Sequence, residues 1–128
     1  MKVKVGQGSC GIATGAKKVA DSIDAMIKRD NLDVDLEVTG CVGTCFLEPI
    51  VDVYDDEEKL TRYVNVKPEE VESIFKHHFS DGKISSEHVI DEEDEKFITR
   101  QQRIVLRNCG LINPEKIEDY ISEGGYEA

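Results

Sequence analysis

Three of the four cysteines stand in two short, glycine-containing segments, and their thiols are the side chains best suited to chemistry. Cys41 and Cys45 lie in TGCVGTC (residues 39–45), and Cys10 lies in GQGSCG (residues 6–11). Thiolates hold metal ions and iron–sulfur clusters, act as nucleophiles, or pair as disulfides. Because each chemistry requires different neighbours, the surrounding residues decide between them.

The flanking residues predict that both segments lie at one end of a sheet. Residues 2–5 alternate and predict a short strand ending at Gly6, residues 12–29 predict a helix, and residues 33–38 alternate as a second strand. The helix is predicted from apolar side chains that recur at helical spacing: Ala16, Val19, Ala20, Ile23 and Ile27. The strands of such a β-α-β unit are parallel, so Cys10 and the TGCVGTC pair are expected to converge where open α/β sheets place their ligands.

The remaining elements complete a β-α-β-β-β-α order, which predicts an α/β sandwich over residues 1–82. A strand at 50–54 and its hairpin partner at 60–66 flank an acidic turn. A second helix opens at Pro68 and is expected to stop at Asp81-Gly82. Its apolar stripe consists of Val71, Ile74, Phe75 and Phe79.

Beyond this domain the character of the chain changes. Residues 83–100 are polar and acidic without clear periodicity, and they are expected to form a linker. Residues 101–128 resume structure, with a helix predicted from Asn113-Pro114 to Gly124-Gly125. Its apolar face consists of Ile117, Tyr120 and Ile121. A single short helix cannot bury itself, so this tail needs a partner surface.

The composition excludes several classes of partner. The formal net charge of −11 disfavours nucleic acid, because phosphates recruit Lys and Arg. No apolar run approaches the ~20 residues of a membrane span, and the N-terminal MKVKVGQG is too polar for a signal peptide. The chain is therefore expected in the cytoplasm, where thiols stay reduced. The acidic runs at 55–58 and 91–95 are expected to be solvated faces.

Among the thiol chemistries, the residues favour an iron–sulfur cluster and leave zinc open. A structural zinc site takes four ligands, usually from two knuckles, and only the Cys41–Cys45 knuckle is present. The histidines are expected on the second helix or in the linker: His77, His78 and His88. A thioredoxin-type pair has C-x-x-C spacing rather than C-x₃-C, and a cytosolic disulfide is disfavoured. A 2Fe–2S cluster needs four thiolates, of which three are expected here.

The glycines around the cysteines allow a second interpretation. Gly6, Gly8 and Gly11 match the G-x-G-x-x-G spacing of a dinucleotide-binding loop between a strand and a helix. Such a site also needs a repeated βαβ unit, which the sequence does not predict. The same glycines would let backbone N–H groups approach a sulfur centre beside Cys10, and the following helix start would stabilise thiolates. We therefore favour the thiol centre.

GSCGIATGA with its helix, TGCVGTC with the hairpin, and PEEVESIF together resemble the thioredoxin-like 2Fe–2S ferredoxins over residues 2–82. Members of this family accompany the flavin subunit in respiratory complex I and NAD-linked hydrogenases. The tail RIVLRNCGLINPEKIEDYISEGGYEA is similar to the opening of the flavin- and NADH-binding subunit itself. The resemblance implies a fused NADH-oxidising flavoprotein, with residues 101–128 as the start of its flavin region and with FMN and NAD bound only in a continuation.

The resemblance also implies a ligand set. Cys10 matches the second cysteine of the family's first pair, and Cys41 and Cys45 match the second pair. The first cysteine has no counterpart among residues 4–6. Ser9, a solvent oxygen or Cys109 is therefore the candidate fourth ligand.

The expected function is one-electron transfer within a multisubunit oxidoreductase, by a segment that is not catalytic alone. The alternatives are a cluster-less scaffold that docks the flavin subunit, and a zinc-stabilised domain. The expected partners are the flavin/NADH-binding domain and other subunits of the complex. Pairing of two copies through this domain is a further expectation.

Overall fold

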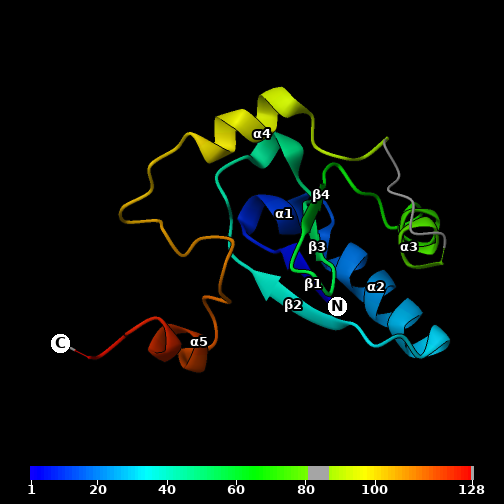
Figure 1. Cartoon of the computed structure of the whole chain (residues 1–128), viewed down its shortest axis with the longest axis horizontal. Helices are drawn as coiled ribbons and strands as arrows, with labels where there is room; N and C mark the ends of the chain where they lie inside the picture. Colours follow the sequence, from blue (N-terminus) through cyan, green and yellow to red (C-terminus); the bar gives the residue numbers. More distant parts are fainter. Residues whose placement is uncertain (81–86, 128) are drawn as a thin grey trace.

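The computed structural model describes residues 1–80 and 87–127. A four-stranded sheet of order β2-β1-β3-β4 forms its centre (Figure 1). The first strand, β1 (Lys2–Gly6), pairs in parallel with β2 (Asp35–Thr39), so the chain leaves both strands at the same edge of the sheet. The predicted parallel β-α-β unit is therefore confirmed.

The other two strands extend the sheet in the antiparallel sense. β3 (Val51–Tyr54) pairs with β1, and β4 (Leu60–Tyr63) pairs with β3. Alternate side chains of these strands face the same helices and form the main core, as the two-residue period of a strand requires. The fully buried strand members are Val3, Val5, Val51, Val53 and Tyr63. The predicted α/β class and the succession of the four strands along the chain are confirmed.

The prediction of a single helix over residues 12–29 is wrong in one respect. The structure has two helices, α1 (Ser9–Ala13) and α2 (Ala16–Asp30), separated at Gly15. Gly15 has a φ of 99°, a left-handed conformation that glycine adopts without a steric penalty. As a result, Cys10 lies in a short helix of its own, rather than in the loop that the sequence suggested.

The second predicted helix is α3 (Val71–Ser80), which begins at Val71 rather than at Pro68. It packs beside α2 on one face of the sheet. Val71, Ile74 and Phe75 are buried and Phe79 is partly buried, which confirms the predicted stripe. The expected stop at residues 81–82 lies outside the described residues.

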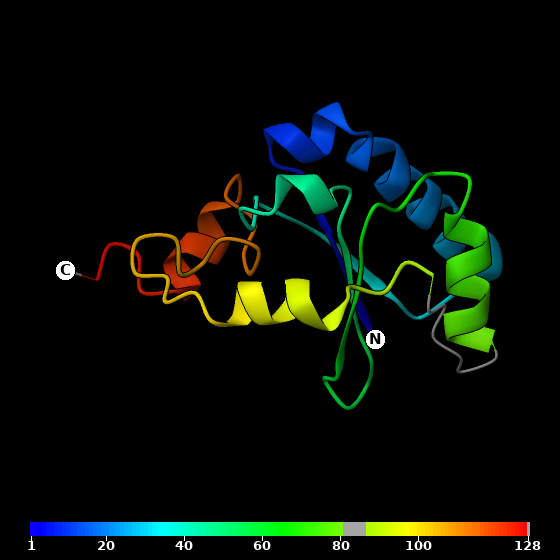
Figure 2. The ribbon, with the colours of Figure 1, turned by 90° about the horizontal axis from the view of Figure 1, so that it is seen from above.

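The expected linker, 83–100, contains structure that the sequence did not predict. Val89 bridges to β4, and α4 (Glu92–Thr99) follows with Asp91 as its N-cap. Figure 2 shows α4 and α2 on opposite sides of the sheet. Ile90 and α4 belong to a second apolar cluster, which also contains Leu47, Ile50 and Val64. The division of the chain into domains stays a prediction.

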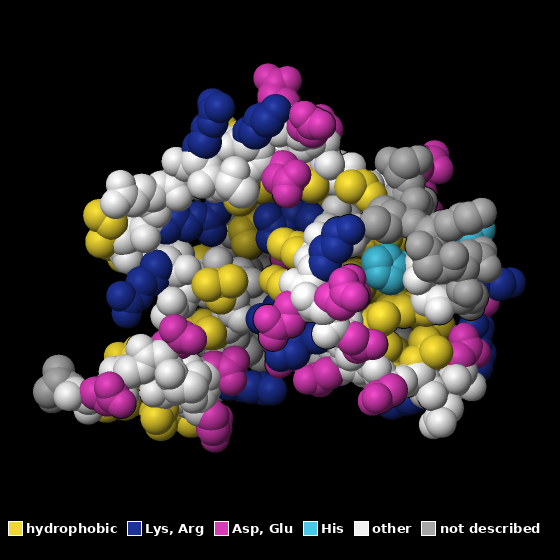
Figure 3. All heavy atoms as spheres, viewed as in Figure 1, with side chains coloured by type: hydrophobic (Ala, Val, Ile, Leu, Met, Phe, Trp, Pro, Cys, Tyr) yellow, Lys and Arg dark blue, Asp and Glu magenta, His cyan; other side chains and the backbone are white. Residues whose placement is uncertain are grey.

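The C-terminal helix is shorter than expected. α5 (Ile117–Ser122) is preceded by a turn in which Asn113 Oδ1 accepts the Glu115 N–H at 3.0 Å. Figure 3 shows hydrophobic side chains exposed over this C-terminal segment; the larger ones include Ile104, Val105, Leu106, Leu111, Ile117, Tyr120 and Ile121. Among the described helices, none combines the length and apolar character needed to cross a membrane.

Candidate metal centre

The two cysteine segments touch where the chain leaves β1 and β2. The Gln7 N–H donates to the Thr39 carbonyl at 2.9 Å, which joins the two loops directly after the strands. Gly8 lies so close to Cys41 that an added Cβ would stand 2.6 Å from the Cys41 Cβ and 3.2 Å from its backbone N. Only glycine permits this approach. The parallel strand pair thus brings the two segments into contact.

The Cys45 thiol interacts with both other thiols of these segments. The pKa of Cys45 is raised, first by a hydrogen-bond interaction with the Cys10 thiol, while interaction with the Cys41 thiol opposes the shift. The pKa of Cys41 is raised first by burial, and the Cys45 thiol adds to this shift. Together with the contact between the two segments, this interaction places Cys45 beside both Cys10 and Cys41. The role of the three cysteines as ligands stays a prediction.

The thiols lie near the surface, and one of them accepts a backbone hydrogen bond. Cys10 and Cys45 are exposed and Cys41 is half-buried. The Gly43 N–H donates to Cys41 Sγ at 3.2 Å, and this bond opposes the rise in the Cys41 pKa. All four cysteines lie in the described ranges, and none is joined in a disulfide. Because the raised pKa values favour protonated thiols, metal binding here would release protons.

The donor set fits two irons better than one small ion. Within the part of the chain that the structure describes, no three His, Cys, Asp or Glu side chains already surround a single metal position. A closed zinc site gathers four ligands around one ion at about 2.0–2.3 Å. A 2Fe–2S cluster is wider and divides its ligands between two irons, so its thiolates need not share one centre. The Gly8–Cys41 contact shows that the two loops touch, and Thr44, directly before Cys45, is buried with no hydrogen-bond partner for its hydroxyl among the described residues.

The two candidate fourth ligands lie in different places. Ser9 is exposed and opens α1, directly beside Cys10. Cys109 is half-buried in the tail, which lies against the cysteine loop. The Arg103 guanidinium fixes this arrangement, because it donates to the carbonyls of both Val42 and Cys109.

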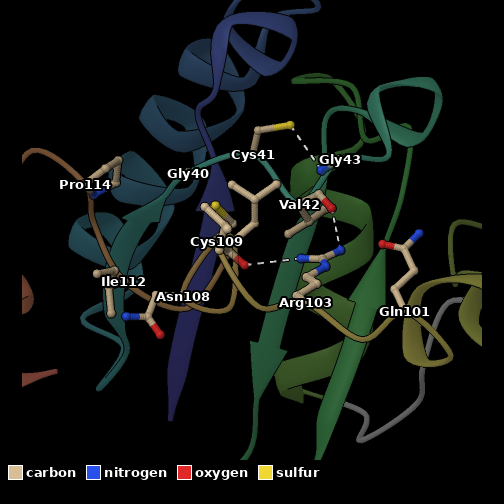
Figure 4. A pocket seen from close by; sticks show the side chains of 12 residues that line it. Gly40, Cys41, Val42, Gly43, Gln101, Arg103, Asn108, Cys109, Ile112 and Pro114 are labelled. Carbon is tan, nitrogen blue, oxygen red and sulfur yellow. Dashed lines mark hydrogen bonds between the residues drawn. The ribbon is translucent and has the colours of Figure 1, made fainter.

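A cavity of about 520 Å³ separates the tail from the cysteine loop, and both Cys41 and Cys109 line it. Figure 4 shows the Cys41 thiol turned toward Gly43 and away from Cys109. Val42 packs against the tail so closely that a Cβ added at Gly110 would stand against its Cγ1. The sequence did not predict this packing, because no local pattern links residues so far apart in the chain.

A buried carboxylate beneath the site was also missed. Glu48 is 5% exposed and lies under the turn after β1, where its carboxylate oxygens stand 3.4–3.5 Å from a Cβ added at Gly6. Burial raises the pKa of Glu48, and the Ile50 N–H, which donates to Oε2 at 3.1 Å, opposes this shift. A glutamate in a loop usually faces solvent, so the sequence alone gave no sign of its burial.

No protein-family model matches the chain. Over 80 residues it is 32% identical to the curated protein "Ferredoxin, 2Fe-2S" of Aquifex aeolicus (strain VF5), covering 60% of this chain and 68% of that protein. Over 28 residues it is 61% identical to "NADP-reducing hydrogenase subunit HndC" of Solidesulfovibrio fructosivorans. That match covers 22% of this chain and only 6% of the subunit, so most of the subunit has no counterpart here.

Solved structures give the same result for the fold. The wild-type thioredoxin-like [2Fe-2S] ferredoxin from Aquifex aeolicus superposes with a TM-score of 0.63 at 26% identity, covering 71% of this chain and 96% of that one. A cysteine-to-serine variant of the same ferredoxin superposes with a TM-score of 0.63 at 25% identity and is covered to 98%. The chain belongs to the family of thioredoxin-like 2Fe–2S ferredoxins.

Proposed function

We propose that this chain binds a 2Fe–2S cluster through Cys10, Cys41 and Cys45 and carries single electrons within a cytoplasmic, NADH-oxidising redox complex. The observation that carries the proposal is the contact between the two cysteine segments, in which the Cys45 thiol interacts with the thiols of both Cys10 and Cys41. Thiolates are the ligands that iron–sulfur clusters use. When bound, the cluster would supply the one-electron redox chemistry, which no side chain of this site provides by itself.

The residues around the thiols would hold and tune such a centre. The Gly43 N–H donates to Cys41 Sγ, and donation to a ligating sulfur stabilises the more negative, reduced state. The exposed positions of Cys10 and Cys45 leave the site open to an approaching redox partner. The Gln7–Thr39 hydrogen bond and the Gly8 contact hold the two loops together, which preorganises the thiols.

For the fourth ligand we favour an oxygen. Ser9 stands next to Cys10 in α1, and solvent reaches the same exposed position. Cys109 and Cys41 line the same cavity, yet the Cys41 thiol points away from Cys109 (Figure 4). An oxygen ligand would leave the centre with fewer thiolates than its relatives have, which shifts its potential and makes it more labile.

The redox complex is inferred from a match of 61% over 28 residues to an NADP-reducing hydrogenase subunit. The resemblance of the tail to a flavin- and NADH-binding subunit extends the proposal to such a unit, with FMN and NAD bound in a continuation of the chain. The apolar side chains exposed in the tail, among them Ile104 and Val105, favour a covering partner. A cluster-less scaffold that docks this partner is the second candidate, because one of the family's four thiolates is absent.

Anaerobic iron and sulfide reconstitution of the full chain tests the proposal. We expect equal amounts of iron and acid-labile sulfide, visible absorbance, and an electron paramagnetic resonance signal on reduction. Serine at Cys10, Cys41 or Cys45 should remove or alter the signal. Protein that binds neither iron nor sulfide would favour the scaffold, whereas stoichiometric zinc that resists replacement would favour the zinc-stabilised domain.

A further inference from the structure

The cavity between the tail and the cysteine loop has a local charge opposite to that of the whole chain. Among the described residues that line it, Arg103 carries the only charge. The segments that form its walls lack acidic residues: residues 38–47 are uncharged, and residues 97–114 contain three arginines and no Asp or Glu. The chain as a whole has 27 acidic and 16 basic residues. An anionic group is therefore attracted to this cavity more than to the surrounding surface.

Arg103 retains hydrogen-bonding capacity for such a group. Its guanidinium donates to the carbonyls of Val42 and Cys109, which places it between the cysteine loop and the tail (Figure 4). Within residues 1–80 and 87–127 it forms no ion pair, whereas Arg62 binds both carboxylate oxygens of Asp52. A guanidinium has five N–H donors in a planar fork that matches a carboxylate. Donors of Arg103 thus remain for a carboxylate from another molecule.

The rest of the cavity wall is largely apolar and continues onto the surface. Val42 and Ile112 line the cavity beside the thiols. Val105 and Leu106 line it as well, yet they are 92% and 60% exposed, and the adjacent Ile104 is 78% exposed. Contiguous exposed apolar side chains mark interaction sites. A small ligand confined to about 520 Å³ would leave Ile104 uncovered, so the surface fits a protein segment better.

We propose that this cavity is the docking site of the redox partner, which presents a carboxylate to Arg103 and apolar side chains to the surrounding wall. The inference rests on the proposed function for its redox role, since electron transfer requires the cluster, whereas docking itself does not. Cys41 lines the same cavity, so a docked segment would stand beside a candidate cluster ligand. One electron lost by the reduced cluster would be gained there by the partner.

The test measures the binding of two short, capped synthetic peptides to the full-length apoprotein by nuclear magnetic resonance titration. One peptide consists of leucine and glutamate, and in the other each glutamate is replaced by glutamine. We expect the glutamate peptide to bind about tenfold more tightly at low salt. Its binding should shift the amide signals of Gly40 and Gly43, which line the cavity, and its advantage should shrink as salt is added.

Arg103→Gln is the critical variant, and Arg100→Gln is its matched control, because Arg100 is an exposed arginine of the same segment that does not line the cavity. Arg103→Gln should bind the two peptides equally, with the affinity of the wild type for the glutamine peptide, and Arg100→Gln should keep the preference for glutamate. If Arg103→Gln binds neither peptide, Arg103→Lys should restore binding with that preference. Equal binding of both peptides by the wild type, an unchanged preference in Arg103→Gln, or no recovery in Arg103→Lys would overturn the inference.

A second copy of this chain is the alternative occupant, because its acidic runs also carry carboxylates. Sedimentation would then show a dimer of the wild type that Arg103→Gln abolishes, and this result would overturn docking of a separate partner. The use of apoprotein keeps the two proposals distinguishable. A wild type that prefers the glutamate peptide but takes up no cluster would overturn the electron-transfer function and leave the docking site standing. A chain that loads the cluster but shows no preference between the peptides would overturn this inference alone.

Discussion

Replacing Gly8 by alanine should separate the two cysteine segments. The new Cβ would stand 2.6 Å from the Cys41 Cβ and 3.2 Å from the Cys41 Cα. Carbon atoms pack at about 3.5–4.0 Å, so the loops must move apart by about 1 Å. Overpacking of this kind costs about 1–3 kcal/mol of folding stability. A cofactor site also tolerates displacements of only about 0.5 Å, so cluster loading should fall more sharply than stability.

Gly40→Ala provides a matched control on the other side of the same cysteine. Its Cβ would stand 3.5 Å from Pro114 Cγ, an ordinary contact that requires no movement of the loops. Urea unfolding of both apoproteins gives the stability difference, and iron and sulfide content after anaerobic reconstitution gives the loading. We expect Gly8→Ala to fold with reduced stability and to load poorly, and Gly40→Ala to match the wild type.

The reasoning would be refuted if folded Gly8→Ala took up iron and sulfide as the wild type does. That result would mean that the cluster does not depend on contact between the two loops. Equal losses in Gly8→Ala and Gly40→Ala would point instead to a general sensitivity of this region to added side-chain volume.

Three further predictions concern other parts of the molecule. Serine at Cys109 should leave the electron paramagnetic resonance spectrum of the reconstituted protein unchanged, whereas alanine at Ser9 should alter it; the reverse result would assign the fourth ligand to the tail. Arg62 donates hydrogen bonds of 2.6 and 2.7 Å to the two carboxylate oxygens of Asp52, whose side chain is only 7% exposed. Arg62→Met should therefore destabilise the protein by about 3–5 kcal/mol in urea unfolding, because it leaves a buried carboxylate without its partner. A change below about 1 kcal/mol would show that the pair is effectively solvated. Burial lowers the pKa of His78 in the folded state. Folding stability should therefore be highest above the unfolded pKa of about 6.5 and should fall as the pH drops through the lower folded pKa. In pH-dependent thermal unfolding His78→Asn should lessen this dependence, and an unchanged dependence would contradict the assignment.

The sequence predicted those parts of the fold that depend on local periodicity. Val3 and Val5 alternate, and the apolar stripe of the second helix has helical spacing, so these elements could be assigned from the chain alone. The break between α1 and α2 was missed, because the left-handed conformation of Gly15 depends on how two helices pack and leaves the apolar pattern intact. The region around α4 was missed because α4 itself has no buried residue and Ile90, just before it, is one of the few buried side chains nearby.

The candidate metal centre, too, could be predicted from the sequence only in part. The meeting of the cysteine segments followed from one topological rule for parallel strands, so it could be predicted from Cys10, Cys41 and Cys45. The burial of Thr44 and Glu48 could not, because a polar residue in a loop carries no local signal of what covers it. The packing of the tail on the cysteine loop is likewise a long-range contact between segments without shared periodicity.

The bridge from Val89 to β4 has a consequence for self-association. It is reinforced by the Ile90 N–H, which donates to the Arg62 carbonyl at 3.1 Å, so main-chain groups along this border of the sheet are occupied. At the opposite border, β2 has β1 as its only strand partner within the described ranges. Because one border is closed, strand-to-strand joining between copies would end at a two-fold dimer instead of propagating into a fibre.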